Sequence, residues 1–188
     1  RMELIYTCIS KLVIYLHRNG RDDLIGHMAH YYDPNDLNRV IYHCSDVDAG
    51  ERFEVLLKDS DTLLEKCGSA FDDVTEYQLF IRCLSEQTIV EDGKRRLRTK
   101  EDGTMDSDLM QSPVDPDATF RTKAGKQHRG YAANVEESVG SNGSIVTDYQ
   151  FDLNNKSDSD FLKDHLASIG HQDEETVVVT DGAYSGDE

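Results

Sequence analysis

The chain has 188 residues, of which 37 are acidic and 20 are basic, so its formal net charge at pH 7 is −17. This length allows one ordinary domain with a buried core, or a small helical module followed by part of another domain. The acidic balance argues against nucleic-acid binding by the protein as a whole. Because no apolar run reaches membrane-spanning length and no signal-peptide pattern occurs, we expect a soluble intracellular protein.

The first half of the chain has helical periodicity. Residues 2–17 predict an amphipathic helix whose buried stripe consists of Leu4, Ile5, Cys8, Ile9, Leu12, Val13 and Leu16. Further helices are expected over residues 22–31 and 50–67, and Asp73 with Glu76 has the spacing of a capping box before a fourth helix. We therefore predict a helical region over residues 1–87. Its widely spaced cysteines are typical of reduced core thiols.

The period changes after residue 87. Asp92-Gly93 indicates a hairpin flanked by residues 88–90 and Leu97, and the alternating stretches 130–139 and 144–151 around GSNG indicate a longer one. Ser157 is placed to cap a helix near residues 158–168. The apolar run from Thr176 to Thr180 is typical of a strand buried on both faces. Residues 88–188 thus predict an α/β domain after an α+β lead-in: a partial ribonuclease H-like mixed sheet with hairpin, crossover helix and parallel strand.

An acid, Asp181, follows directly after this apolar run. In α/β sheets, catalytic groups gather at the carboxyl ends of strands. In a ribonuclease H-like sheet the first and fourth strands lie side by side, so that two carboxylates hold divalent ions about 4 Å apart for attack on a phosphodiester. Magnesium prefers such oxygen ligands. Asp181 is therefore a candidate metal ligand; the alternative is an ordinary turn residue.

One basic stretch stands out against the acidic background. Residues 94–129 carry nine Lys/Arg and six Asp/Glu, a local charge of +3, whereas the remaining residues carry 11 and 31, a charge of −20. A polyanion would be drawn to this stretch. The candidates for contact with DNA phosphates are Arg121, Lys123, Lys126 and Arg129. The alternative is a solvated charged loop.

Several spaced motifs occur in order in the second half: DPDA at 115–118, K-x-G-K at 123–126, GYAAN at 130–134 and DGAYSGDE at 181–188. On these motifs the stretch 109–188 resembles DDE transposases of bacterial insertion sequences. The upstream segments HYYDPNDLNRVIYHCSD and YQLFIRCLSEQTIVEDGKRRLRTKEDG resemble the helical lead-in of the same group.

The resemblance implies an enzyme that cuts and rejoins DNA at the ends of its element, using three carboxylates and two Mg²⁺ or Mn²⁺ ions. On this chain it implies Asp181 as the second acid and Asp115 as the first, with Asp117 as the next choice. Proline on both sides of Asp115 does not suit a central strand. A rival alignment of SEQTIV makes Glu86, or its neighbour Asp92, the first acid.

The third acid implied by the resemblance is a glutamate, which we expect beyond residue 188, and we expect both ends of the sequence to be cut. Such a fragment would be inactive alone. The implied partner is double-stranded DNA, both at the element ends and at the target site. The resemblance also implies that the complete enzyme is a homodimer. It implies no membrane association and a location at the nucleoid in the bacterial cytoplasm. The alternatives are a ribonuclease H-like DNA-binding module that has lost catalysis by decay or domestication, and another ribonuclease H-like nuclease.

Overall fold

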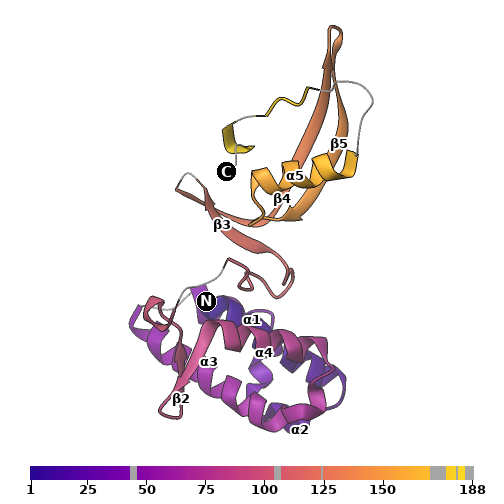
Figure 1. Cartoon of the computed structure of the whole chain (residues 1–188). Coiled ribbons are helices and arrows are strands. Elements are labelled where there is room, and N and C mark those ends of the chain that lie inside the picture. The colour runs from indigo at the N-terminus through magenta and orange to yellow at the C-terminus, as the bar shows by residue number, and fades with distance from the viewer. Residues whose placement is uncertain (43–45, 104–106, 124, 170–176, 181, 185–188) are drawn as a thin grey trace. The chain divides into compact units, whose positions relative to one another are not determined.

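The chain divides into two compact units, residues Arg1–Pro116 and Asp117–Glu188. The computed structural model describes residues 1–42, 46–103, 107–123, 125–169, 177–180 and 182–184. The first unit is mainly helical, and the second contains a sheet with one long helix (Figure 1). All strand pairings in the described residues are antiparallel, so the chain has an α+β character.

The first unit is built around the first helix, α1. Its predicted apolar stripe is buried, except for the partly buried Leu4, and α1 packs against α2, α3 and α4. The helical segments are α1 (Met2–Arg18), α2 (Asp22–Ile25), a 3₁₀ turn (Gly26–Tyr32), a π-helical turn (Asn38–Tyr42), α3 (Asp46–Cys67), a 3₁₀ turn (Gly68–Phe71), α4 (Thr75–Gln87) and a last 3₁₀ turn (Lys100–Asp102). None of the described helices is both long enough and apolar enough to cross a membrane.

The predicted capping box of Asp73 and Glu76 is wrong. Helix α4 begins one residue later than that motif requires, with Val74 at the N-cap and no side chain capping it. The backbone N–H of Val74 instead donates to the carbonyl of Phe71 (2.9 Å). The preceding 3₁₀ turn therefore fixes where the helix starts, and the side-chain spacing does not.

A short hairpin follows α4 and belongs to the helical unit. Strands β1 (Thr88–Glu91) and β2 (Lys94–Leu97) pair as predicted around Asp92-Gly93, where both residues have positive φ, as a tight hairpin turn requires. Arg95 of β2 pairs with Asp61 of α3 (2.7 Å). The described residues from 88 to 103 and from 107 to 116, which the sequence predicts as part of the second domain, thus belong to the helical unit.

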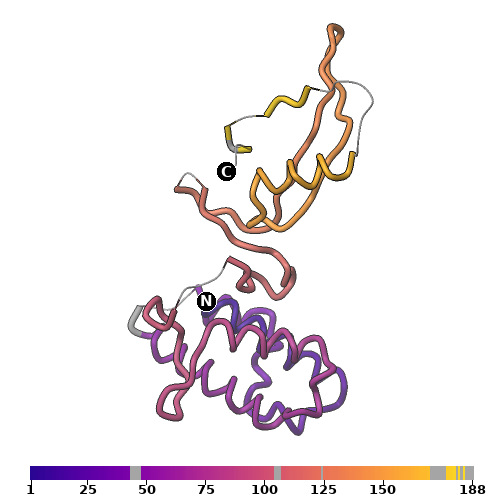
Figure 2. The backbone as a smooth tube through the Cα atoms, in the orientation of Figure 1, coloured from indigo at the N-terminus to yellow at the C-terminus, as the bar shows by residue number. Residues whose placement is uncertain are grey.

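The second unit is a three-stranded sheet in the order β3-β4-β5. Its elements are β3 (Thr119–Lys123), β4 (Lys126–Gly140), β5 (Gly143–Leu153), α5 (Asp158–Ile169) and a 3₁₀ turn (Gly182–Tyr184). The long hairpin around GSNG is confirmed (Figure 2). The capping role of Ser157 is confirmed too, because its Oγ accepts from the N–H of Asp160 (3.1 Å).

Helix α5 lies over one face of the β4–β5 hairpin, which it contacts through the buried His165 (Figure 1). The other face carries side chains that are exposed in this structure, namely Tyr131, Val135, Tyr149 and Phe151. Two of them, Tyr131 and Phe151, stack with ring centroids 4.9 Å apart.

The predicted parallel strand is not formed in the part of it that the structure describes. Residues Val177 to Thr180 have no regular secondary structure, and Val177 and Val179 are 79% and 89% exposed. An apolar β-branched run becomes a strand only where a sheet edge accepts its hydrogen bonds. The described part of this run pairs with no strand. Thr176 and Asp181 lie outside the described residues.

Buried aspartates are the main polar feature of the helical unit. The carboxylate of Asp36, 3% exposed, accepts from the Tyr6 hydroxyl (2.6 Å) and contacts His30 and Arg39. A similar arrangement joins Tyr31, Asp59 and His27. Burial raises the pKa of Asp36, but the three hydrogen bonds outweigh it and hold this pKa below its ordinary value.

The Asp36 contacts make a prediction about stability. Replacing Tyr6 by Phe, or Asp36 by Asn, is expected to lower the free energy of unfolding by about 1–3 kcal/mol at neutral pH, because buried partners lose a hydrogen bond. A group with a depressed folded pKa stabilises fully above the unfolded value of about 3.9 and loses this effect as pH falls through the folded pKa.

The difference between wild type and Asp36→Asn should therefore shrink in acid. Urea unfolding at neutral and acidic pH measures it, with Glu65→Gln, an exposed acid on α3, as the matched control. A difference between wild type and Asp36→Asn that stays constant through the acid range would contradict the assigned role.

Candidate functional site

Of the two acids in the DPDA motif, Asp117 is the one that belongs to the sheet unit. It lies exposed in the turn directly before β3. Asp115 is also exposed, in a bend near the end of the helical unit. Asp181, the predicted second acid, lies outside the described residues, whereas Tyr184, three residues later, is described.

The rival first acid, Glu86, has structural contacts within the helical unit. Its Oε1 accepts from the Nε of Arg82 (2.7 Å), and its Oε2 accepts from the backbone N–H of Met110 (2.6 Å). Met110 is buried in the helical core. The hydrogen bond from Met110 to Glu86 therefore holds the segment around Met110 against α4. Asp92 is exposed at the turn between β1 and β2.

The basic stretch 94–129 divides into two parts with different contacts. In its first part, arginine side chains pair with acids of the helical unit: Arg95 with Asp61, and Arg96 with Glu91 and Asp102. The second part is the β3–β4 hairpin, which carries all four residues predicted to contact DNA phosphates. Lys94 and Lys100 of the first part are exposed, and the hairpin carries the four predicted residues close together.

Lys123 and Lys126 face each other across the β3–β4 turn, with Lys123 also paired to Asp158 at the start of α5 (3.0 Å). Arg121 and Arg129 line a cavity of about 520 Å³ in the sheet unit, together with His128. The Nε of Arg121 is buried and has no hydrogen-bond partner among the described residues. A buried guanidinium N–H without a partner is costly, and an anion can satisfy it.

Two residues of different motifs meet at the edge of this cavity. The hydroxyl of Tyr184, from DGAYSGDE, donates to Oδ1 of Asn134, from GYAAN, at 2.6 Å. The Nδ2 of Asn134 donates in turn to Oε1 of Gln150 on β5 (3.0 Å). The segment that follows Asp181 is thereby tied to the face of the hairpin that α5 also contacts.

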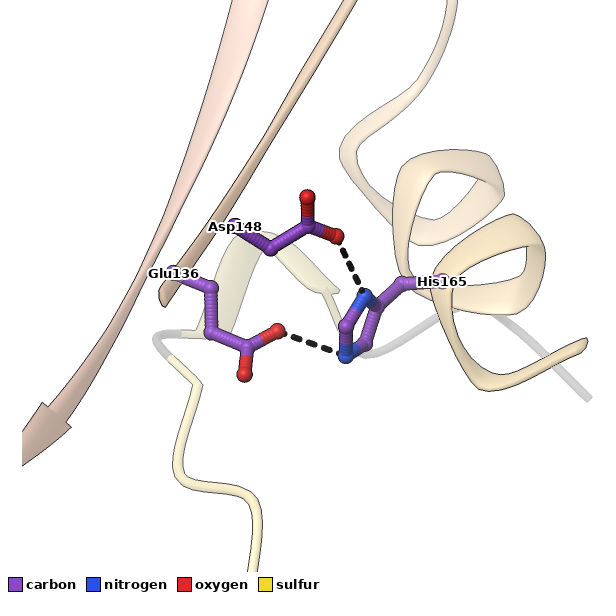
Figure 3. Close-up of side chains that lie close together, drawn as sticks. All are labelled: Glu136, Asp148 and His165. Atoms are coloured by element: carbon purple, nitrogen blue, oxygen red, sulfur yellow. Dashed lines mark ion pairs between the residues drawn. The ribbon is translucent and has the colours of Figure 1, made fainter. Parts of the chain in front are cut away.

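A cluster of two carboxylates and one imidazole lies further along the same face (Figure 3). Glu136 of β4 and Asp148 of β5 stand directly opposite each other in the strand register. His165 of α5 reaches both: its Nε2 lies 2.6 Å from Oε2 of Glu136, and its Nδ1 lies 3.3 Å from Oδ2 of Asp148. The histidine side chain is 8% exposed. These three residues can hold a metal ion, the only such group in the described part of the chain.

This cluster is not apparent from the sequence, for a specific reason. A regular hairpin around the Ser141-Asn142 turn would place Glu136 opposite Thr147. The register instead shifts between Glu136 and Glu137, which brings Asp148 opposite Glu136. Such a bulge redirects side chains and leaves little trace in the sequence. The one signal in the sequence was His165, four residues after Phe161 on the apolar face of the predicted helix.

Comparison of the chain with models of known protein families, with curated proteins and with solved structures finds no match in any of the three.

The contact between Tyr184 and Asn134 leads to a prediction. Tyr184→Phe is expected to speed amide exchange at Val177–Thr180 and Tyr184 by up to about tenfold, because one hydrogen bond contributes roughly 0.5–1.5 kcal/mol. Tyr149→Phe, which removes an exposed hydroxyl from the opposite face, serves as the control. Hydrogen exchange followed by mass spectrometry measures both; equal exchange in wild type and Tyr184→Phe would show that the contact does not anchor this segment.

Proposed function

We propose that the sheet unit is part of the catalytic domain of a DDE transposase with a ribonuclease H-like fold, which holds DNA phosphates on its β3–β4 hairpin. The observation that carries this proposal is the contact between Asn134 and Tyr184. The resemblance identified GYAAN and DGAYSGDE as separate motifs, 50 positions apart at these two residues, and the fold joins them by a 2.6 Å hydrogen bond. Motifs that work at one site are expected to meet in space.

The arrangement of elements supports the same proposal. A hairpin, a helix across one face of it and then the segment leading to Asp181 follow in the order expected for such a domain. Strand β3 lies at one edge of the sheet, immediately after Asp117. In the proposed complete sheet, a strand carrying Asp181 would pair with the open edge of β3, on the other side from β4.

The charge distribution supports DNA as the partner. The chain as a whole is strongly acidic, yet Arg121, His128 and Arg129 line one cavity. Cationic side chains and backbone N–H groups hold phosphates in register without reading base sequence. Lys126 extends the positive charge at the exposed turn of the same hairpin. Because of this local positive potential, a polyanion can be attracted to one surface of an otherwise acidic protein.

Asp117 and Asp181 would hold the magnesium ions in this proposal, with Asp115 as the alternative to Asp117. The donor chemistry fits, because carboxylate oxygens are the ligands that Mg²⁺ prefers, and Asp117 is exposed to solvent. Bound magnesium would stabilise the attacking and leaving oxygens of the phosphodiester. The basic side chains of the hairpin would orient the DNA by its phosphates.

The basic cavity can be tested by binding. Replacing Arg121 and Arg129 together by Gln is expected to weaken binding to duplex DNA and to reduce the slope of log K against log salt by about 1 for each phosphate that the variant no longer neutralises. Fluorescence anisotropy of labelled DNA over a salt series measures this. Lys163→Gln removes one exposed charge of the same sign from α5 and should change little. Identical slopes for wild type and double variant would leave the hairpin without a role in DNA binding.

The acids can be tested by cleavage of element-end DNA in Mg²⁺ by the full-length gene product. Asp181→Asn is expected to reduce specific cleavage by at least about 100-fold, because removal of a ligand leaves the metal pair incompletely held. Comparison of Asp117→Asn with Asp115→Asn identifies the first acid, since only one should have this effect. Specific cleavage that survives Asp181→Asn would overturn the site assignment.

A second candidate is a ribonuclease H-like DNA-binding module without catalysis. It is favoured by one observation: residues Val177 to Thr180 lie exposed and outside any strand, so the described part of the chain has no strand on the open edge of β3. The two candidates give the same result in the binding experiment and opposite results in the cleavage experiment.

A further inference from the structure

Two carboxylates stand directly opposite each other on β4 and β5, which is an unfavourable arrangement. Like charges at paired positions of an antiparallel sheet repel and destabilise it. Glu136 and Asp148 are such a pair, and Glu137 adds a third acid next to the bulge. In the described residues no lysine or arginine forms an ion pair with Glu136 or Asp148. A local cation is therefore needed to make this register favourable.

His165 supplies one contact to each carboxylate, and its position is fixed by α5. The remaining oxygens are held by other donors: the Thr147 hydroxyl donates to Oε1 of Glu136 (3.3 Å), and the Tyr149 backbone N–H donates to Oδ1 of Asp148 (2.8 Å). These two hydrogen bonds hold each carboxylate in place, so that its other oxygen faces the imidazole. Hydrogen bonds of this kind orient ligands and increase their affinity for a metal.

We propose that Glu136, Asp148 and His165 bind one divalent transition-metal ion of the zinc class, which joins α5 to the bulge of the hairpin. One imidazole nitrogen with two carboxylates suits zinc, cobalt or manganese, whereas magnesium and calcium are held by oxygen ligands. This site is distinct from the proposed magnesium-binding acids and does not depend on DNA chemistry.

The geometry accommodates such an ion after small movements. One ligand atom from each residue lies within 4.8 Å of the other two, and ligands about 2.0 Å from a tetrahedral zinc lie about 3.3 Å apart. Glu136, whose side chain is 40% exposed, has room to withdraw from its 2.6 Å contact with the imidazole. A cavity of about 630 Å³, lined by Glu136, His165 and Leu162 among others, gives access for the ion and for a water molecule as fourth ligand.

A metal ion also explains the choice of a buried histidine. Each of its two ring nitrogens lies close to a carboxylate oxygen. Zinc requires the nitrogen that binds it to be free of its proton, so zinc binding weakens as pH falls. The ion would supply two positive charges between carboxylates that repel each other.

The test uses the full 188-residue chain without a histidine tag, stripped with chelator and titrated with zinc chloride in a large excess of Mg²⁺. One zinc ion per chain is expected, with a raised Tm and with an affinity that weakens as pH falls. Glu136→Gln and His165→Gln should each weaken zinc binding by at least about tenfold, as changes to groups behind the ligands alone cost roughly 10- to 100-fold. Glu137→Gln and Asp181→Asn are the matched controls and should retain wild-type affinity.

Cobalt provides a readout that does not depend on variants folding. Co²⁺ bound to wild type should give the visible absorption of a four-coordinate site, and zinc should displace it. The proposal would be overturned if this absorption were absent, or if wild type and folded Glu136→Gln bound zinc with equal affinity. His165 would then have only the role of an ion-pair partner between α5 and the hairpin. Loss of zinc binding in Asp181→Asn would also overturn it, because the ion would then belong to the transposase acids. None of these outcomes bears on DNA binding by the basic hairpin.

Discussion

The docking of α5 on the β4–β5 hairpin depends on compensation of two opposed carboxylates. Hydrophobic contact alone is limited here, because Phe161 and His165 are the fully buried positions of this helix in the described residues. Without a cation between Glu136 and Asp148, the strands would repel at the bulge and the helix would lose one of its polar contacts with the sheet, leaving those of Asp158 and Asp164 with Lys123 and Lys156. With a cation there, the repulsion is offset, and β4, β5 and α5 are joined at this point. The same residues that make the hairpin unfavourable by itself therefore specify where the helix must lie.

Local patterns in the sequence were sufficient to predict the elements but not their junctions. The apolar stripe of α1, the turn chemistry of Asp92-Gly93 and the cap at Ser157 each depend on residues within a few positions of one another, and all three predictions are confirmed. The capping box at Asp73 failed because a neighbouring 3₁₀ turn moved the helix start by one residue. The predicted strand at 176–180 depends on a partner distant in sequence, and composition alone cannot provide that partner.

The proposed metal-ligating cluster also could not be predicted from local sequence patterns. Each ligand was visible as an ordinary residue: an acid on each strand of an alternating hairpin and a histidine on an apolar helix face. Their convergence depends on a single inserted residue at the bulge, which changes the partner of Glu136 from Thr147 to Asp148. The basic residues proposed to contact DNA are easier to recognise, since a cluster of charge in the sequence remains a cluster on a short hairpin such as β3–β4.

Opposite charges are separated along one face of the sheet unit, and the contact between Asn134 and Tyr184 marks the boundary. Both residues line both cavities. On one side lie Arg121 and His128, and on the other lie Glu136 and His165. A polyanion is attracted to the first and repelled by the second, whereas a metal cation has the reverse preference. Tyr184 lies between the two cavities and lines both of them. Because the two sets of residues are separate, the proposed anionic partner and the proposed metal ion would not compete for the same side chains.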